Sequence, residues 1–178
     1  MELTAIRSTA PEPSEHTPYY DRYISLVGTA DIVTTLEHQW RETVDLLSGL
    51  TDVKANYRYS PEKWSVKEML GHVSDTERIM SYRALRIARN DRTPMEGFEQ
   101  DDYVRGANFG EYRLPEMLEE FTCVRHATVL LFRHLHGEAW SRRGVANQNP
   151  VSVRALAYII AGHEIYHRNM LKERYLKS

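Results

Sequence analysis

Apolar residues recur at intervals of three or four along four stretches of the chain, and this spacing constrains the fold more than any other feature of the sequence. Such spacing places the apolar side chains on one face of an α-helix. The four stretches cover residues 30–48, 65–90, 114–136 and 151–176. No convincing strand pattern and no internal repeat accompany them. We therefore predict an all-α protein that folds as a four-helix bundle.

Local signals mark the ends of these helices. Ser65 and Glu68 have the spacing of a capping box at the start of the second helix. Ser152 is a candidate cap for the fourth helix, just after the break that Pro150 introduces. Gly49 suits the C-terminal end of the first helix.

The N-terminal part of the chain differs from the rest. Pro11, Pro13 and Pro18 argue against an early helix. We therefore expect an N-terminal extended segment over residues 1–28, followed by the bundle over residues 29–178. The first part of this segment could be a disordered tail, whereas the tyrosines near its end suggest packing onto the bundle.

The link between the second and third helices, roughly residues 91–113, is long for a bundle connection. An extended link of this length could run along the whole bundle and leave the second and third helices parallel. It could also fold over one end of the bundle as a lid.

Composition and charge exclude several classes of protein. A formal net charge of −2 lacks the basic surface of a nucleic-acid-binding protein. The single cysteine, Cys123, allows no intrachain disulfide and no Cys-x-x-Cys motif. No apolar run approaches the ~18 residues of a membrane span, and residues 1–28 lack the pattern of a secretory signal. We expect a cytoplasmic globular domain with no nucleic-acid or membrane partner.

Three of the eight histidines fall on or beside an apolar stripe. His163 and His167 lie about 20° to either side of Leu156 in a projection of ~100° per residue, so both should point into the core. They are one turn apart, which places their Cβ atoms ~5–6 Å from each other. His72 lies about 60° from Met69, at the edge of the apolar stripe of its helix.

The other five histidines fit a shared site less well. Their helical phases or their positions in loops predict that they face solvent or cap helix ends. They are His16, His38, His126, His134 and His136.

Two interpretations of the inward histidines stay open. A lone buried histidine is more often a hydrogen-bonded core residue than a ligand, and a buried polar group without a partner costs about 1–3 kcal/mol. A divalent ion shared by His72, His163 and His167 would satisfy all three. With no obvious fourth protein ligand, such a site would keep an open position for water or a thiolate, as catalytic sites do. Imidazole suits Zn, Ni, Fe and Cu alike.

Two glutamates lie near these histidines in the predicted helices. Glu77 lies close to the apolar stripe of the second helix, and Glu164 directly follows His163. A nearly buried carboxylate needs a partner. Glu77 could act as a general base or accept a hydrogen bond from a ligand's ring, or it could form a salt bridge with Arg125. Arg125 could alternatively bind an anionic group of a substrate.

Gly71 and Gly162 each directly precede a candidate ligand. A glycine inside a helix costs about 1 kcal/mol relative to alanine, so each needs an explanation. Both fall away from the apolar stripes. They could let the N-terminal tyrosine segment, a lid or a second subunit lie close to the bundle.

Several motifs resemble those of the DinB-like (damage-inducible) four-helix-bundle metalloproteins. The motifs are Lys63-Trp64-Ser65-Val66-Lys67-Glu68, Gly71-His72-Val73, Asp75-Thr76-Glu77-Arg78, Ser152-Val153-Arg154-Ala155-Leu156, and Gly162-His163-Glu164 with His167. The run from Tyr82 to Arg89 also resembles an uncharacterised bacterial branch of this family. The resemblance begins at about residue 18 and covers nearly all of the chain from there.

The resemblance implies an up-down-down-up bundle and one divalent metal, here Zn, Ni or Fe, held by His72, His163 and His167. Family members with known activity include bacillithiol transferases and a mycothiol-dependent maleylpyruvate isomerase, and homodimers are common. The resemblance therefore implies transfer of a low-molecular-weight thiol, as cosubstrate, to an electrophilic small molecule.

Within this hypothesis, Glu77 would handle protons, and Glu164, Arg125 and Asn108 would support the ligands or contact the substrate. The link over residues 91–113 could cover the site. Three alternatives stay open: a metal-dependent hydrolase, a non-catalytic metal-binding stress-response protein, and a bundle whose three histidines are only core residues.

Overall fold

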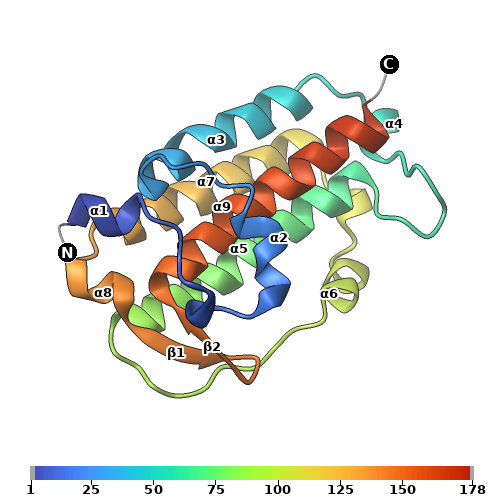
Figure 1. The fold of residues 1–178 in the computed structure, drawn as a ribbon. Helices are drawn as coiled ribbons and strands as arrows, with labels where there is room; N and C mark the ends of the chain where they lie inside the picture. The colour runs from blue at the N-terminus through green and yellow to red at the C-terminus, as the bar shows by residue number, and fades with distance from the viewer. Residues whose placement is uncertain (1–2, 177–178) are drawn as a thin grey trace.

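The computed structural model describes residues 3–176 as a bundle of four long helices with smaller elements around it (Figure 1). The long helices are α3 (Ile32–Leu47), α5 (Val66–Ala88), α7 (Leu114–Arg133) and α9 (Val153–Met170). Each lies within a stretch predicted from apolar spacing, so the all-α bundle is confirmed. A short helix, α4 (Asp52–Ala55), lies between α3 and α5, and a π-helical turn, η4 (Leu171–Tyr175), continues α9.

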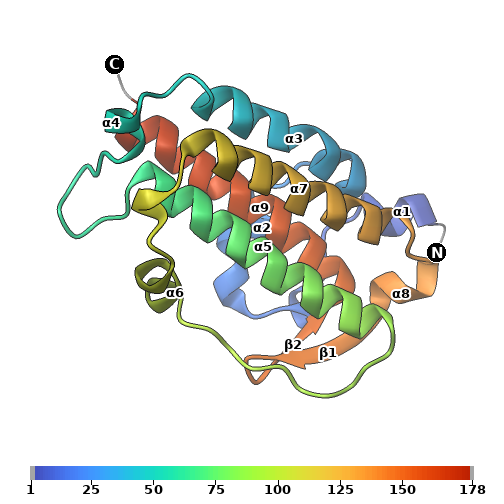
Figure 2. The same ribbon diagram turned by 180° about the vertical axis from the view of Figure 1, so that it is seen from behind.

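The four long helices run up, down, down and up. Helices α3 and α9 point one way and α5 and α7 point the other, as both views show (Figures 1 and 2). Helices α5 and α7 can be parallel because the crossover between them, residues 89–113, returns along the bundle. This crossover carries α6 (Gln100–Ala107) and a 3-10 turn, η3 (Phe109–Glu111). Of the two alternatives for the link, the structure shows the one that runs along the bundle.

The residues predicted to cap the second and fourth helices form these caps in the structure. The Ser65 hydroxyl accepts a hydrogen bond from the Glu68 N–H at 3.2 Å, and the Glu68 carboxylate accepts one from the Ser65 N–H at 2.6 Å. These two bonds complete the capping box of α5. The Ser152 hydroxyl accepts a hydrogen bond from the Ala155 N–H at 2.9 Å, which caps α9.

The N-terminal segment folds into short helical turns, where the sequence predicted an extended segment or a tail. Its elements are α1 (Leu3–Arg7), η1 (Pro13–Glu15), η2 (Pro18–Tyr20) and α2 (Asp21–Ile24). Pro13 and Pro18 each occupy the first position of a 3-10 turn, where the missing N–H is not needed.

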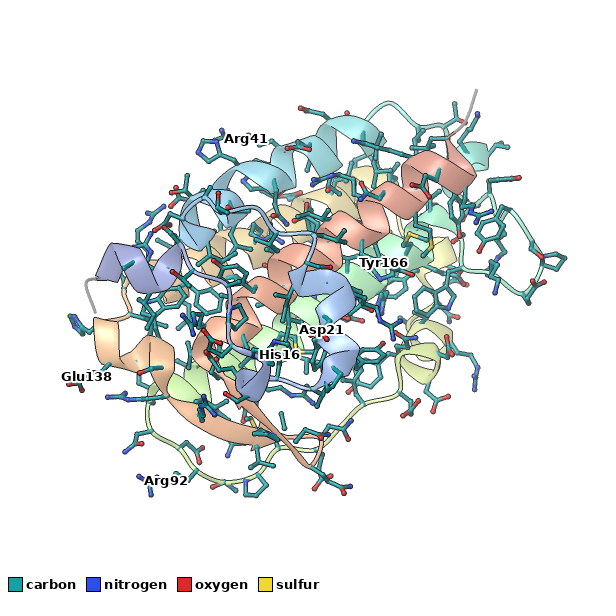
Figure 3. The ribbon with its side chains drawn as sticks, in the orientation of Figure 1. His16, Asp21, Arg41, Arg92, Glu138 and Tyr166 are labelled. Atoms are coloured by element: carbon teal, nitrogen blue, oxygen red, sulfur yellow. The ribbon has the colours of Figure 1, made fainter. Side chains whose placement is uncertain are left out.

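Residues 12–24 form a strap that lies across α9, with His16 and Asp21 over the bundle (Figure 3). Buried Glu15 holds the strap in place. Its carboxylate accepts a hydrogen bond from the Ser152 hydroxyl at 2.6 Å and forms an ion pair with Arg154. Burial of a carboxylate is tolerated here because it has both a cationic and a hydroxyl partner.

A β-hairpin that the sequence did not predict stands between α8 (Gly137–Ser141) and α9. Strand β1 (Arg143–Ala146) pairs antiparallel with β2 (Asn149–Ser152). Asn147 and Gln148 form the turn with φ values of 49° and 62°, the left-handed conformation that tight hairpin turns require. In the sequence, Pro150 indicated only a break before the fourth helix. Strands of four residues are too short to show a clear alternation of apolar and polar side chains. The hairpin tip also forms a bridge to the crossover at Met95.

Buried apolar residues form two clusters, one toward each end of the bundle. Between the clusters, all four long helices contribute buried polar side chains, which we call the polar layer. Its members are Gln39, Thr43, His72, Thr76, Glu77, Arg125, His163, Glu164, His167 and Arg168. Within residues 3–176, no helix has both the length and the apolar character that crossing a membrane requires.

Two glycines let other segments lie directly against the bundle. A Cβ atom at Gly71 of α5 would lie 2.4 Å from the ring of Phe109 in the crossover. A Cβ atom at Gly162 of α9 would lie 2.1 Å from the carbonyl oxygen of Tyr23 in the strap. The tyrosine segment therefore explains Gly162, and the crossover explains Gly71.

We expect Gly162→Ala to lower the free energy of unfolding by about 1–3 kcal/mol, because the new methyl group meets a backbone carbonyl that moves only with the strap. Urea unfolding followed by circular dichroism measures this change. Gly106→Ala is the matched control, since no atom lies within 4 Å of its Cβ position in α6, and it should stabilise slightly. If the Gly162→Ala protein is as stable as the wild type, the close contact between Gly162 and the Tyr23 carbonyl group is contradicted.

Candidate metal centre

Three histidines from two neighbouring helices meet in the polar layer. His72 comes from α5, and His163 and His167 come from successive turns of α9. The Nε2 atom of His163 lies 3.0 Å from Nε2 of His72 and 3.1 Å from Nε2 of His167. All three side chains are buried, and one candidate ligand atom from each lies within 4.8 Å of the others. The structure thus brings together the three histidines that helical phase singled out.

Hydrogen bonding alone cannot satisfy this arrangement. A neutral imidazole has one N–H and one lone pair on its two ring nitrogens. The Nε2 atom of His163 faces two other Nε2 atoms, yet it can donate one hydrogen bond or accept one. One close contact between nitrogens therefore has no hydrogen bond in any combination of tautomers. A cation that accepts a lone pair from each Nε2 removes this conflict, so the three residues fit a metal ion.

The spacing of the nitrogens also suits a small divalent ion. Tetrahedral ligation at ~2.0–2.1 Å places ligand nitrogens ~3.3 Å apart, close to the two short separations between Nε2 atoms. Neighbouring rings help to orient the imidazoles. The Tyr23 ring packs edge-on against His163 with centroids 5.2 Å apart, and the Trp64 ring lies 4.6 Å from that of His72.

Burial keeps these imidazoles uncharged at neutral pH. Desolvation lowers the pKa of His72 to about 4 and the pKa of His167 to about 3. It also lowers the pKa of His163 well below its usual value, and the two neighbouring imidazoles add to that shift. The neutral form is the one that binds a metal, so no proton has to leave at neutral pH.

Glu77 and Arg125 form a buried ion pair. Arg125 donates from Nε to Glu77 Oε1 at 2.9 Å and from Nη2 to Glu77 Oε2 at 2.8 Å. Its Nη1 lies 2.7 Å from Glu164 Oε2. Both carboxylate oxygens of Glu77 are therefore engaged, and Arg125 is fully buried. Of the alternatives that the sequence left open for Glu77, the structure shows the salt bridge with Arg125. A catalytic role for Glu77 and a substrate-binding role for Arg125 stay predictions.

Glu164 faces α3 rather than the histidine cluster. Its Oε1 accepts a hydrogen bond from the Thr43 hydroxyl at 2.6 Å, and its Oε2 accepts one from the Gln39 amide. Arg168 approaches the same carboxylate at 3.5 Å. The residue next to His163 in sequence therefore fixes α9 against α3 and α7, and it accepts no hydrogen bond from a ligand's ring.

The remaining predicted residues lie away from the cluster. Asn108 is exposed at the end of α6, in a left-handed conformation with φ 53°, and does not line the cavity described below. Four histidines are exposed as predicted, namely His38, His126, His134 and His136. His16 does not face solvent, since it is buried within the strap. It stands at the C-cap position of η1, with its Nδ1 3.0 Å from the Thr17 carbonyl oxygen.

A cavity of about 630 Å³ opens beside His72 and His163. This volume lies within the range of small-molecule sites. Helices α5 and α9 form its floor, and the strap, the crossover and the hairpin tip form its walls. The cavity gives a small molecule access to two of the three histidines.

Sequence reasoning missed the side chains that complete the cavity, among them Tyr20, Tyr23, Arg83, Phe98 and Asn147. Arg83 could have been found. It follows His72 by eleven positions on α5, which returns it to within about 20° of the same helical direction. The others come from the strap, the crossover and the hairpin, and tertiary contacts alone place these segments over the histidines.

Comparisons with known proteins match most of the chain. The sequence profile of the DinB superfamily matches residues 35–171. The chain is similar to the solved structure of YfiT from Bacillus subtilis, with 14% sequence identity and a TM-score of 0.73 over 96% of this chain and 94% of that chain. YfiT is described as "a probable metal-dependent hydrolase with an unusual four-helix bundle topology". No protein of curated function matches.

We expect the free energy of unfolding of metal-free protein to fall between about pH 7 and pH 5. Unfolded histidine titrates near pH 6.5, whereas the folded pKa is about 4 for His72 and about 3 for His167. The unfolded state therefore binds more protons in this window, so acidification favours it, by roughly 2 kcal/mol for each histidine at pH 5. Urea unfolding of chelator-treated protein measures the loss. A flat profile would contradict buried neutral histidines.

Replacing Arg125 with methionine should cost roughly 3–5 kcal/mol of stability, because it leaves buried Glu77 without a counter-charge and leaves Glu164 with only Arg168, at 3.5 Å. Arg133→Met is the control. Arg133 pairs with Glu37 at the surface, where its side chain is 48% exposed, and such pairs contribute about 0–1 kcal/mol. Urea unfolding at neutral pH compares the two variants. Equal losses of unfolding free energy in the two variants would contradict a larger contribution from the buried ion pairs than from the surface pair.

Proposed function

The chain belongs to the DinB superfamily, and from this premise we propose that it is a divalent-metal-dependent enzyme acting on a small molecule. We assign His72, His163 and His167 as the ligands. The observation that carries the proposal is the meeting of three Nε2 atoms that no set of hydrogen bonds satisfies, beside a cavity that reaches two of them. We further propose that residues 29–178 form the metal-binding bundle domain and that residues 1–28 are an N-terminal segment, whose strap, residues 12–24, lies over that domain.

His72, His163 and His167 would hold a divalent cation as neutral imidazoles, and that cation would supply a Lewis acid that lowers the pKa of a bound nucleophile. The residues of this chain do the rest. His72 and His163 face the cavity, so a nucleophile and its acceptor can meet there. The strap and crossover reduce access of water from two sides. Tyr23 packs on His163 and fixes the ring that lies at the cavity floor.

Transfer of a low-molecular-weight thiol is the reaction we propose. With Glu77 and Glu164 committed to Arg125, neither carboxylate of the polar layer is available as a general base. To be ionised at neutral pH, a thiol bound to the metal needs its pKa lowered only from about 8.5 to about 7, whereas bound water needs its pKa lowered from about 15.7 to about 7. With both carboxylates of the polar layer paired to Arg125, the thiol is therefore the nucleophile that this site would ionise more readily.

Hydrolysis is the second candidate, and the description of YfiT as a probable metal-dependent hydrolase favours it. The same cavity and ligands would serve, with water in place of the thiol. A homodimer and a cytoplasmic location, suggested by the resemblance and by the sequence, remain predictions.

Untagged protein should contain about one equivalent of a divalent ion by mass spectrometry, and His163→Ala should remove it, because two imidazoles hold a metal weakly. His126→Ala is the matched control, since His126 is exposed on α7 and should leave the metal content unchanged. Metal-free protein after incubation with Zn, Ni and Fe salts would overturn the proposal.

Metal-loaded protein is then assayed with a panel of thiols and an electrophilic acceptor, and in parallel with ester and amide substrates. Turnover that depends on both thiol and metal supports thiol transfer. Metal-dependent hydrolysis without thiol-dependent turnover would replace it with the hydrolase alternative.

A further inference from the structure

One buried arginine differs from the others in its partners. Four arginines are buried among residues 3–176: Arg83, Arg125, Arg154 and Arg168. The last three each form an ion pair with at least one glutamate. Arg83 is only 4% exposed, yet no carboxylate of the described residues forms an ion pair with it. Its hydrogen bonds go to the Glu96 carbonyl oxygen at 2.5 Å and to the Met80 sulfur at 3.7 Å.

A buried guanidinium without a counter-charge is unfavourable, because desolvation of a charge is compensated only by an opposite charge or a full set of acceptors. Burial lowers the pKa of Arg83, and the groups that oppose this shift are Tyr20 and Tyr103 rather than a carboxylate. Burial also raises the pKa of Tyr20, which keeps that phenol uncharged at neutral pH. Arginine stays cationic in proteins, so a positive charge persists at this point of the fold.

Arg83 lines the cavity that reaches the histidines. His72, Thr76, Met80 and Arg83 all line it from α5, which makes them one row along the helix. At 1.5 Å per residue, Arg83 lies about 16 Å from His72 along the helix axis. The cavity is therefore an elongated trench with the histidines toward one end and a cation toward the other.

Aromatic side chains form part of the lining. The Tyr23 ring packs on His163 with centroids 5.2 Å apart, the Phe98 ring lies 5.9 Å from the Arg83 guanidinium, and Tyr20 of the strap also lines the trench. The hairpin tip adds Asn147 and Asn149 to the lining. The Asn147 side chain lies beside Gly97, which follows the Glu96 whose carbonyl oxygen binds Arg83. Glu99 also lines the cavity, so its formal charge is near neutral and it does not suit a polyanion.

We propose that Arg83 binds the carboxylate of the substrate, and that the substrate is an elongated small-molecule monoanion with an apolar or aromatic middle. Its carboxylate accepts hydrogen bonds from the guanidinium, and its reactive group lies at the histidines. The planar fork of arginine matches a carboxylate in geometry. The placement of the reactive group at the histidines rests on the proposed function, whereas the carboxylate site depends on Arg83 alone.

The test uses a matched pair of probes, 5-phenylpentanoate and 5-phenylpentanamide, which differ in charge and not in shape. Binding to metal-loaded and chelator-treated protein is measured by NMR titration. We expect the acid to bind at least tenfold more tightly than the amide, and Arg83→Gln to abolish this preference. Arg92→Gln is the charge-matched control, because Arg92 is exposed at the outer edge of the crossover (Figure 3) and should retain the preference.

Three results would overturn the inference: equal binding of the two probes, no binding of the acid to the wild type, or a preference that survives in Arg83→Gln. A preference that disappears with the metal but survives in Arg83→Gln would place the carboxylate at the histidines, which overturns this inference and supports the proposed function. Conversely, a preference that needs Arg83 in protein that binds no metal would support this inference while the proposed function fails.

Arg83 also ties α5 to the crossover through Glu96, so Arg83→Gln could lose its fold. Arg83→Lys then decides the question. It keeps the charge but not the planar fork, so we expect the acid to bind several-fold more weakly than to the wild type while still exceeding the amide. Unchanged acid binding in a folded Arg83→Lys protein would contradict recognition by the guanidinium.

Discussion

The ion cluster at the centre of the polar layer is the interaction on which the rest of the structure depends. Arg125 on α7 holds Glu77 on α5 and Glu164 on α9, and Glu164 reaches α3 through Thr43. All four long helices are therefore tied together at one level of the bundle. Buried ion pairs add little net stability over apolar packing, but a mispaired one is costly. The cluster thus selects which helix faces meet, and the apolar clusters on either side supply the stability.

The same level of the bundle positions the candidate metal centre. His163 is adjacent to Glu164, so the contacts of that carboxylate set the rotation of α9 and with it the direction of two imidazoles. His72 stands on α5 just over one turn before Glu77, whose pairing with Arg125 sets the rotation of α5. Three ring nitrogens meet because two rigid helices are locked, with no loop involved, which is the kind of support that a preorganised site requires.

Sequence alone was sufficient where helix geometry is local. Apolar spacing gave the four helices, and a fixed angle per residue selected His72, His163 and His167 from eight histidines. It failed where burial depends on distant partners. Glu15 and His16 are buried because Arg154 and Ser152 receive the strap 137–139 residues later in the chain. For Glu77, helical phase admitted both a base and an ion pair, and only the position of α7 distinguished them.

The strap has a consequence for how this protein could diversify. The superfamily profile matches from residue 35 onward, so it includes the three histidines and not the strap. Tyr20 and Tyr23, which form one wall of the trench, therefore lie outside the part of the chain that the superfamily profile matches. Tyr23 packs on His163, so a substitution there would disturb an imidazole, whereas Tyr20 lines the trench from the same segment. Substitutions at Tyr20 could therefore change which molecules are admitted while the imidazoles stay in place, so selectivity could evolve, or be engineered, without a change at the reactive centre.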